Sequence, residues 1–428
     1  MKKKIYLIGL NLYSIFLSLK IKKDFKDFDI SIIEASNNFL KAYQSIKIKN
    51  YNVNPGFHAF EKTRSEELIK FLKKIISLKT IYKTRGILIQ NNIISYTDSF
   101  DLWPKEIIKK YKLKRKQIRI NPINNIEYLN KNYLNYLTTN YFGKEVKFRN
   151  TISSAYPWFF PPNYDIASND EGSVFNSKIR KKKINHAFVF PSKGAFYDIA
   201  LSIKKLLKKE KIRIEFNKPI NFLKKNKSIT YEGYSELNKN NNKKIVCVPV
   251  VPLTYFIKQK KQKISLKPVK YYTGLIEIKN FIKSDIDQFT EIITSSEFAY
   301  GLTRISLYSE IFDIKKKIYQ IEFIEHSYEV NTDIQVKKII SFISKFIKFK
   351  SKNVSNIKLI DYSFVRNIFR PNKRLIDKLV KKSVNFFDDS KNVIFPRQIT
   401  WPINSNKHLH YATEDYNKII KKFLNDQK

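Results

Sequence analysis

The first 34 residues constrain the fold of this chain more than any other stretch. A short apolar run suited to a buried strand ends at Gly9, where a sharp turn is needed. The residues after it carry apolar side chains at helical spacing, and a second apolar strand closes at Glu34. The helical stripe consists of Leu12, Ile15, Phe16 and Leu19. Free N–H groups at the start of such a helix attract a pyrophosphate, and a carboxylate after the second strand can accept hydrogen bonds from ribose hydroxyls. The segment therefore predicts a βαβ unit of the dinucleotide-binding kind.

The glycine pattern of this unit is incomplete. The positions of G-x-G-x-x-G hold Gly9, Asn11 and Ser14, so only the turn glycine is kept. Asn11 adds a side chain where phosphate oxygens approach the backbone, although its amide can itself donate to a phosphate. Ser14 is small enough to keep the helix close to the strand. The pattern leaves open an ordinary βαβ unit that holds no ligand.

The N-terminal segment also permits a second interpretation, a secretory signal. The sequence MKKK and the apolar run to Leu19 imitate the charged and apolar regions of such a signal. No small-x-small cleavage site follows, and a strand pattern resumes directly, which favours the βαβ unit. No other apolar stretch approaches the ~20 residues that span a bilayer.

The formal net charge of +44 suggests a nucleic-acid or anionic-membrane partner. The excess is nearly all lysine, is spread along the whole chain, and accompanies abundant Ile, Asn, Phe and Tyr, a bias typical of AT-rich coding. The sequence has no RNA-recognition motif, zinc-finger spacing or GxxG loop, so we predict no specific nucleic-acid partner. A basic nucleic-acid or membrane-surface protein, and a weak association with anionic surfaces, stay open as alternatives.

Composition sets further bounds. The 428 residues and 43% apolar content suffice for two lobes with proper cores. A single cysteine, Cys247, excludes an internal disulfide and fits a reducing compartment, so we expect a cytoplasmic protein. The five histidines lack cysteine or acidic partners at chelating spacing, so no metal site is predicted.

Three features further along the chain are candidates for chemistry. A Pro/Gly loop after the first unit contains Gly56 and His58, a histidine that can orient a substrate or serve as a structural hydrogen-bonding residue. An aromatic, proline-rich segment contains Tyr156 and Trp158, whose rings suit a flat or sugar-like substrate or pack in a core. Arg304, in a strand-like segment, can bind an anionic substrate bidentately or stand on the surface of a strand.

Four segments, spread over nearly the whole length, carry a family resemblance. They are IYLIGLNLYS with IIEAS, then NPGFHAFE, then FPSKGAFYDIALSIKKLL with the strands up to IVCVPVVP, and finally NVIFPRQITWPI with the terminal helix. In this order and spacing the chain resembles the flavin-dependent amine oxidase superfamily, which includes protoporphyrinogen-oxidase-like proteins and UDP-galactopyranose mutase. The resemblance implies an FAD cofactor.

The resemblance also assigns residues to parts of that cofactor. It places Gly9, Asn11 and Ser14 along the pyrophosphate, Glu34 at the adenosine ribose, Gly56 and His58 near the isoalloxazine ring, Ile220 at the adenine, Arg397 near the pyrophosphate, and a helix beginning near Thr413 with its N-terminus toward the flavin. Pro396 stands where the family commonly has glycine, which is a third departure beside Asn11 and Ser14.

We therefore predict an α/β fold with a Rossmann-like FAD/NAD(P)-binding lobe on a parallel sheet and a second, mixed α+β substrate lobe. The cofactor lobe would be discontinuous, from residues 1–78, 186–270 and 388–428, with 79–185 and 271–387 forming the substrate lobe. The predicted function is an FAD-dependent oxidoreductase of the amine-oxidase or protoporphyrinogen-oxidase type, or a sugar-nucleotide mutase-like enzyme, acting on a small molecule such as a nucleotide sugar. The departures leave open a non-catalytic relative that keeps the fold and has lost FAD.

Overall fold

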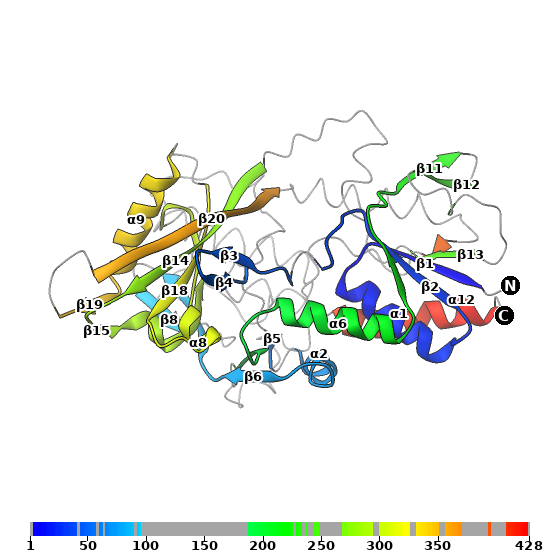
Figure 1. The fold of residues 1–428 in the computed structure, drawn as a ribbon, viewed down its shortest axis with the longest axis horizontal. Helices are drawn as coiled ribbons and strands as arrows, with labels where there is room; N and C mark the ends of the chain where they lie inside the picture. The colour runs from blue at the N-terminus through cyan, green and yellow to red at the C-terminus, as the bar shows by residue number, and fades with distance from the viewer. Residues whose placement is uncertain are drawn as a thin grey trace, which may run out of the picture.

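The described residues form two main sheets, each with its own hydrophobic core (Figure 1). The computed structural model describes residues 3–40, 43–56, 60–62, 65–89, 92–95, 187–225, 228–232, 237, 244–247, 268–293, 299–325, 331–350, 356–369, 393–394 and 408–426. One of the two main sheets has five parallel strands, and both chain ends lie beside it (Figure 1).

All neighbouring strands of the five-stranded sheet run parallel. In spatial order they are β10 (Arg213–Glu215), β2 (Asp29–Ile33), β1 (Lys4–Ile8), β13 (Lys244–Cys247) and β21 (Val393–Ile394). The helix α1 (Leu12–Asp24) connects β1 to its neighbour β2. The predicted βαβ unit and its parallel sheet are therefore confirmed.

Helix α1 is buried around most of its surface, not along one stripe. The predicted stripe residues Leu12, Ile15 and Phe16 are buried, but so are Tyr13 and Leu17. The reason is a tertiary contact with the C-terminal helices, which are drawn in red in Figure 1. These are α11 (His408–Asp415), a π-helical turn (Tyr416–Ile420) and α12 (Lys421–Asp426).

Hydrogen bonds fasten this contact at both ends of α1. The Tyr13 hydroxyl donates to Oδ2 of Asp415 at 2.5 Å, in a fully buried position. The Tyr416 hydroxyl donates to Oδ2 of Asp24 at 2.8 Å. The C-terminal segment is thereby part of the core of the parallel sheet.

Smaller elements complete this core. A three-stranded antiparallel sheet has the order β5 (Phe60–Glu61), β9 (Phe188–Pro191) and β6 (Leu78–Ile81). The helices α2 (Glu66–Leu72) and α6 (Tyr197–Lys209) pack their apolar sides into the same core. A separate hairpin joins β11 (Asn221–Lys225) to β12 (Ser228–Glu232).

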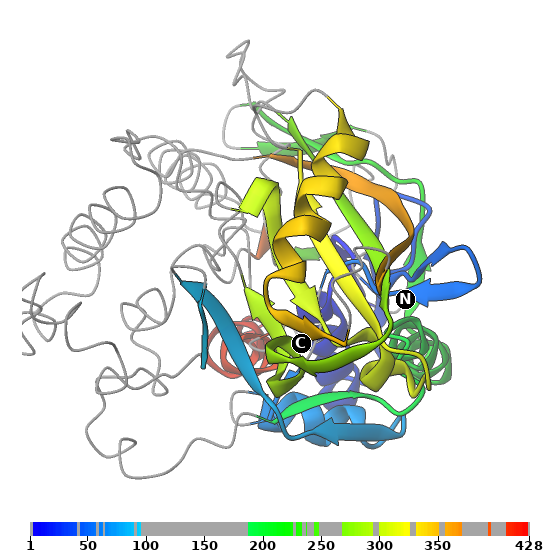
Figure 2. The same ribbon diagram turned by 90° about the vertical axis from the view of Figure 1, so that its left-hand side faces the viewer.

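The second main sheet has seven strands and is antiparallel except where β16 pairs with β7. Its order is β20 (Ile357–Phe369), β14 (Pro268–Ile278), β18 (Ile318–Ile324), β17 (Leu302–Ser306), β16 (Phe289–Ile293), β7 (Thr84–Ile89) and β8 (Asn92–Ser95). Helix α9 (Thr332–Ser344) lies across one face of this sheet (Figure 2). Two short 3-10 helices (Asp285–Gln288 and Ala299–Gly301) lead directly into β16 and β17. The strand pair β15 (Phe281–Ser284) and β19 (Ile347–Phe349) packs against the same hydrophobic core.

One short helix connects the core of the parallel sheet to a smaller hydrophobic cluster on the seven-stranded sheet. Ile311 of α8 (Tyr308–Phe312) packs in the core of the parallel sheet, and Tyr308 packs with the hairpin β3 (Ile46–Ile48) and β4 (Tyr51–Val53) against the seven-stranded sheet. The Tyr308 hydroxyl donates to the carbonyl oxygen of Asn52 at 2.6 Å. Helix α8 is therefore a structural link between the two sheets.

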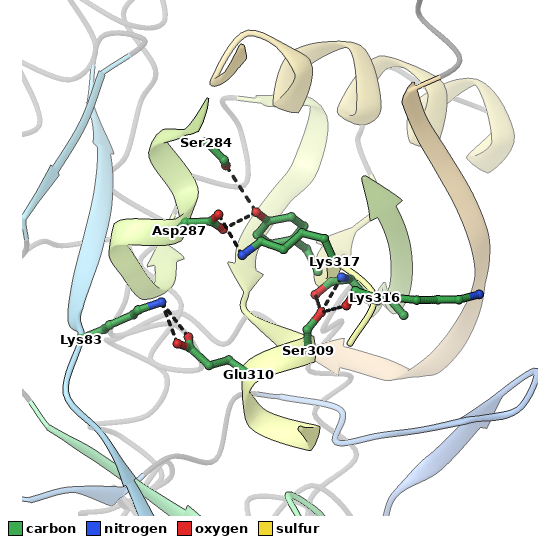
Figure 3. A network of polar contacts seen from close by, with 9 residues as sticks. Lys83, Ser284, Asp287, Ser309, Glu310, Lys316 and Lys317 are labelled. Atoms are coloured by element: carbon green, nitrogen blue, oxygen red, sulfur yellow. Dashed lines mark hydrogen bonds and ion pairs between the residues drawn. The ribbon is translucent and has the colours of Figure 1, made fainter. Parts of the chain in front are cut away.

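Polar contacts hold α8 in place (Figure 3). Ser309 donates from Oγ to the carbonyl oxygen of Lys316 at 2.6 Å, which fixes the helix to the approach to β18. Lys83 forms an ion pair of 2.8 Å with Glu310, from the segment that leads into β7. A neighbouring pair, Lys317 with Asp287 at 2.8 Å, lies over the start of β18 (Figure 3).

The fold class predicted from the sequence is confirmed as α/β with a parallel sheet, whereas the division into a cofactor lobe and a substrate lobe, with its boundaries, stays a prediction. Within the described part of the chain, no helix is both long and apolar enough to cross a membrane.

Candidate functional site

The turn after β1 is the first part of the candidate site. Gly9 has φ +93°, a conformation that costs a residue with a Cβ on the order of 1–2 kcal/mol. Its N–H donates to the carbonyl oxygen of Ile33 at 2.8 Å, which brings the ends of β1 and β2 together. Among the described residues, a Cβ added at Gly9 would meet only Nδ2 of Asn11, at 3.8 Å. The backbone at this turn is therefore open to the close approach of a ligand.

Asn11 is the N-cap of α1. Its Oδ1 accepts a hydrogen bond from the N–H of Ser14 at 2.9 Å, which is the usual contact of an asparagine cap. Because the oxygen faces the helix, the amide nitrogen is the atom that lies beside Gly9. Asn11 thus places a hydrogen-bond donor at the turn where the glycine pattern has no side chain. The first turn of α1 contains no acidic residue that would repel an anion.

Glu34 lies directly after β2 and is held against the same turn. Its Oε2 accepts from the N–H of Leu10 at 3.0 Å. Its Oε1 accepts from the N–H and Oγ of Ser36, at 2.9 and 2.8 Å. A carboxylate has roughly four acceptor positions, so one stays available to a ribose hydroxyl. The structure therefore brings Gly9, Asn11 and Glu34 together, as the sequence predicted.

Ser14 and Ile220 are both buried. The Ser14 side chain lies inside the core, and its Oγ has no hydrogen-bond partner in the described part of the chain. Ile220 follows a segment in which the N–H of Lys218 donates to the carbonyl oxygen of Glu34 at 3.0 Å. Ile220 thus lies on the chain segment next to Glu34, where the resemblance places the adenine.

The predicted start of the C-terminal helix is wrong. The helix begins at His408, five residues before Thr413. The backbone amide of Thr413 is therefore in the helix interior, outside the first turn where free N–H groups can meet a ligand. Any cofactor contact from the helix N-terminus would come from residues near His408.

Gly56 belongs to a turn that contacts the seven-stranded sheet. Its φ is +81°, and its N–H donates to Oε1 of Glu322 on β18 at 2.6 Å. The carbonyl oxygen of Asn54 accepts from Nε2 of Gln320 at 2.8 Å. The Asn54 side chain in turn donates from Nδ2 to the carbonyl oxygen of Gly194 at 2.8 Å. The loop predicted to lie at the flavin ring is therefore held by side chains of β18 on one side and by the backbone carbonyl of Gly194 on the other.

Glu322 and Gln320 belong to a set of six buried polar side chains, which we call the polar block. They occupy directly opposite or alternating positions on β14, β18, β17 and β16, so they share one sheet face. On β18 the alternating residues Tyr319, Ile321 and Phe323 lie in the core with α9, so the polar block is on the other face. The polar block consists of Thr273, Glu291, Arg304, Ser306, Gln320 and Glu322.

Arg304 lies at the centre of the polar block and is only 7% exposed. Its Nε is 3.3 Å from Oε2 of Glu291, and its Nη1 is 3.4 Å from Oε2 of Glu322. The alternative of an arginine on the surface of a strand is therefore wrong. The role of Arg304 toward an anionic substrate stays a prediction, and its guanidinium already forms ion pairs with two carboxylates of the chain.

Several predicted residues lie outside the described residues: His58, Tyr156, Trp158 and Arg397. The predictions about them stay predictions. Among the described residues, no group of three or more His, Cys, Asp or Glu side chains is placed to hold a metal ion.

Sequence reasoning missed the polar block apart from Arg304. The available signal was the alternation of Gln320 and Glu322 in the apolar strand IYQIEFI. That pattern ordinarily indicates a solvent-facing side of a strand, whereas here the polar side is buried against the Asn54–Gly56 turn.

No protein-family model matches this chain, and neither does any curated protein sequence. Similarity is found among solved structures, over almost the full length. The reduced form of UDP-galactopyranose mutase aligns with a TM-score of 0.62 at 11% identity, over 98% of this chain and 96% of that one.

Two other solved structures give the same result. A protoporphyrinogen oxidase-like protein from Exiguobacterium sp. 255-15 aligns with a TM-score of 0.59 at 11% identity, over 99% of both chains. Putrescine oxidase bound to putrescine aligns with a TM-score of 0.55 at 12% identity, over 98% of this chain and 99% of that one.

These proteins are members of the flavin-dependent superfamily that the sequence resembles. The chain therefore has the fold of a flavin-dependent oxidoreductase or mutase, and the predicted resemblance is confirmed at the level of the fold.

Proposed function

We propose that this chain is an FAD-dependent oxidoreductase, with the cofactor at the carboxyl ends of β1 and β2 and the seven-stranded sheet on the substrate side. The observation that carries this proposal is the Gly9 turn, where an open backbone, the Asn11 amide and the fixed Glu34 carboxylate meet. A fold similarity that extends over nearly the whole chain supports it.

The residues present fit this cofactor. The N–H groups at the start of α1 and the Asn11 amide would hold the pyrophosphate, because both are donors and no acidic side chain lies in that first turn. The remaining acceptor position of Glu34 would take a ribose hydroxyl. The Asn54–Gly56 turn would lie at the flavin ring and Ile220 at the adenine.

A bound flavin supplies hydride or electron transfer, and the protein's contribution is to bind, orient and enclose the substrate. The similar structures include an oxidase and a sugar-nucleotide mutase, and a small-molecule substrate suits either activity. Of these two activities we propose oxidation as the main candidate and the mutase-like activity as the alternative.

A specific observation also favours a second candidate, a non-catalytic relative without FAD. Two backbone N–H groups at the turn already have partners within the chain. Oδ1 of Asn11 accepts from Ser14, and Oε2 of Glu34 accepts from Leu10. A phosphate would compete with these contacts, and the cost would lower the affinity for FAD.

Cofactor uptake separates the two candidates. The flavoenzyme should purify yellow, with flavin absorbance, or should gain roughly 2.7 kcal/mol of stability at FAD concentrations 100 times the Kd. A colourless protein whose melting temperature is unchanged by excess FAD would exclude the flavoenzyme and leave the non-catalytic relative.

A pair of glycine variants tests whether the Gly9 turn is the binding site. Gly9→Ala puts a methyl group into the open space beside Asn11, and we expect FAD affinity to fall at least about tenfold. Gly86→Ala is the matched control, because its Cβ would meet Phe289 at 2.9 Å in the seven-stranded sheet. The control should lose stability and keep its FAD affinity.

A further inference from the structure

The Asn54–Gly56 turn is held from the other end of the sequence. Gly56 donates its N–H to Oε1 of Glu322 at 2.6 Å, although the two residues are 266 positions apart. Gln320, on the same strand, donates to the carbonyl oxygen of Asn54 at 2.8 Å. Because Gly56 has a positive φ, the direction of the chain as it leaves the turn depends on how this amide is held.

The surroundings of Glu322 suit a carboxylate. Its side chain is buried, Oε1 also accepts from Nε2 of Gln320 at 2.9 Å, and Oε2 faces the guanidinium of Arg304. Each of these groups is a donor, which fits an acceptor-only side chain. A glutamine at this position would turn its NH2 toward one of these donors, whichever way the amide was oriented.

We propose that Glu322 is a positioning residue, which sets the Asn54–Gly56 turn at the edge of the flavin from the seven-stranded sheet. Arg304 and Gln320 hold the carboxylate, and the carboxylate holds the Gly56 amide. What the turn touches rests on the proposed function. The hydrogen bonds that define the turn do not, because both partners of each bond belong to the chain.

Glu291 provides a matched control. It is buried to the same extent as Glu322, and it forms an ion pair with the same guanidinium. It stands on β16, however, separated from β18 by β17, and it faces Ser306 across the strand pair. A change at Glu291 therefore removes one of the two Arg304 ion pairs and leaves the contacts of Glu322 with Arg304 and Gly56 in place.

The first measurement is hydrogen exchange of the Gly56 amide in the cofactor-free protein. In Glu322→Gln we expect exchange to accelerate by roughly tenfold or more, the size expected from loss of one hydrogen bond to a charged group. Glu291→Gln should leave this amide protected. Equal exchange in wild type and Glu322→Gln would overturn the proposal.

A second variant is needed in case Glu322→Gln does not fold. Gln320→Met keeps all charges of the polar block and removes the hydrogen bond to the Asn54 carbonyl. It should loosen the turn to a smaller degree, because Gly56 keeps its acceptor. Full protection of the turn in this variant would count against a role for the β18 side chains.

The second measurement follows the flavin. Loaded with FAD, Glu322→Gln should bind the cofactor at least about tenfold more weakly and shift its visible absorbance, whereas Glu291→Gln should do neither. A loosened turn with unchanged FAD affinity and spectrum would refute positioning of the cofactor. A wild-type protein that takes up no FAD would refute the proposed function, and the exchange comparison would still decide whether Glu322 holds the turn.

Discussion

The two main sheets accommodate an arginine in opposite ways. In the parallel sheet, Arg213 of β10 pairs with Asp29 of β2, and 57% of the arginine side chain is exposed. In the seven-stranded sheet, Arg304 lies between Glu291 and Glu322, and both carboxylates are almost fully buried. Each pairing joins neighbouring strands, but only the second removes its charges from water.

This difference separates polar groups that we propose to face a ligand from polar groups that hold the chain. In the parallel sheet the polar groups of the candidate site stand at the strand ends, where the Asn11 amide provides a donor and Glu34 an acceptor. In the seven-stranded sheet the polar block lies in the middle of the strands and holds the Asn54–Gly56 turn. Substitutions in the two sheets should therefore change the free energy of unfolding by different amounts.

The largest effect is expected from removing the buried cation. Arg304→Met leaves Glu291 and Glu322 buried without their guanidinium, and we expect a loss of about 3–5 kcal/mol in the free energy of unfolding. Denaturant titration measures this loss. Arg213→Met is the control in the parallel sheet and should change stability by about 1 kcal/mol or less. Similar losses in the two variants would contradict the contrast between the sheets.

The next largest difference in stability is expected between alanine substitutions at two glycines with positive φ. A Cβ at Gly194 would lie 2.5 Å from the carbonyl oxygen of Ile311 in α8, so Gly194→Ala combines backbone strain with a clash. We expect it to cost about 2–4 kcal/mol. Gly9→Ala carries the strain alone and should cost about 1–2 kcal/mol. Thermal unfolding of both variants gives the order, and a more harmful Gly9→Ala would show that the turn is not open.

A smaller effect should depend on pH. The hydrogen bond from Tyr416, helped by Lys421, lowers the pKa of Asp24 below its ordinary value of 3.8. The group therefore stabilises the fold fully above about pH 3.8 and loses this contribution as the pH falls through the lowered pKa. Tyr416→Phe should cost about 1 kcal/mol at neutral pH, and the gap to wild type should close in acid. A gap that is constant with pH would argue against the contact.

The smallest changes in stability should come from two buried hydroxyls, one in the core of the parallel sheet and one in the polar block. Ser14 and Thr273 have hydroxyl oxygens without a hydrogen-bond partner among the described residues. Ser14→Ala and Thr273→Val should therefore be neutral or stabilising by up to about 1 kcal/mol. Ser18→Ala is the comparison, since its Oγ donates to the carbonyl oxygen of Ile15 at 2.7 Å and its loss should be slightly destabilising. Melting temperatures show whether each substitution stabilises or destabilises the protein.

The N-terminal part of the candidate site was predictable because its signals are local. Gly9, Asn11 and Glu34 lie within one βαβ unit, and strand and helix periodicity fix where each side chain falls. Even here the full burial of α1 was not predictable. It arises from packing against the C-terminal helices, as in the hydrogen bond between Tyr13 and Asp415, two residues that lie 402 positions apart in the sequence.

The polar block was not predictable, for the same reason in stronger form. It depends on cross-strand register, which brings Thr273 and Arg304 to opposite sides of Glu322, and no local pattern contains that information. The start of the C-terminal helix was missed because the apolar stripe begins only near Tyr416, while the polar turn at His408 gives no signal. Tertiary packing, not periodicity, decides both features.

Helix α8 has a consequence for how the molecule comes apart. Ile311 and Tyr308 stand on the same five-residue helix, and Ile311 packs in the core of the parallel sheet while Tyr308 packs against Leu275 and Ile318 of the seven-stranded sheet. Unfolding of either sheet therefore removes part of the packing of the other. A chain with two sheets would ordinarily lose them in separate steps. Here calorimetry should record one cooperative transition that covers both.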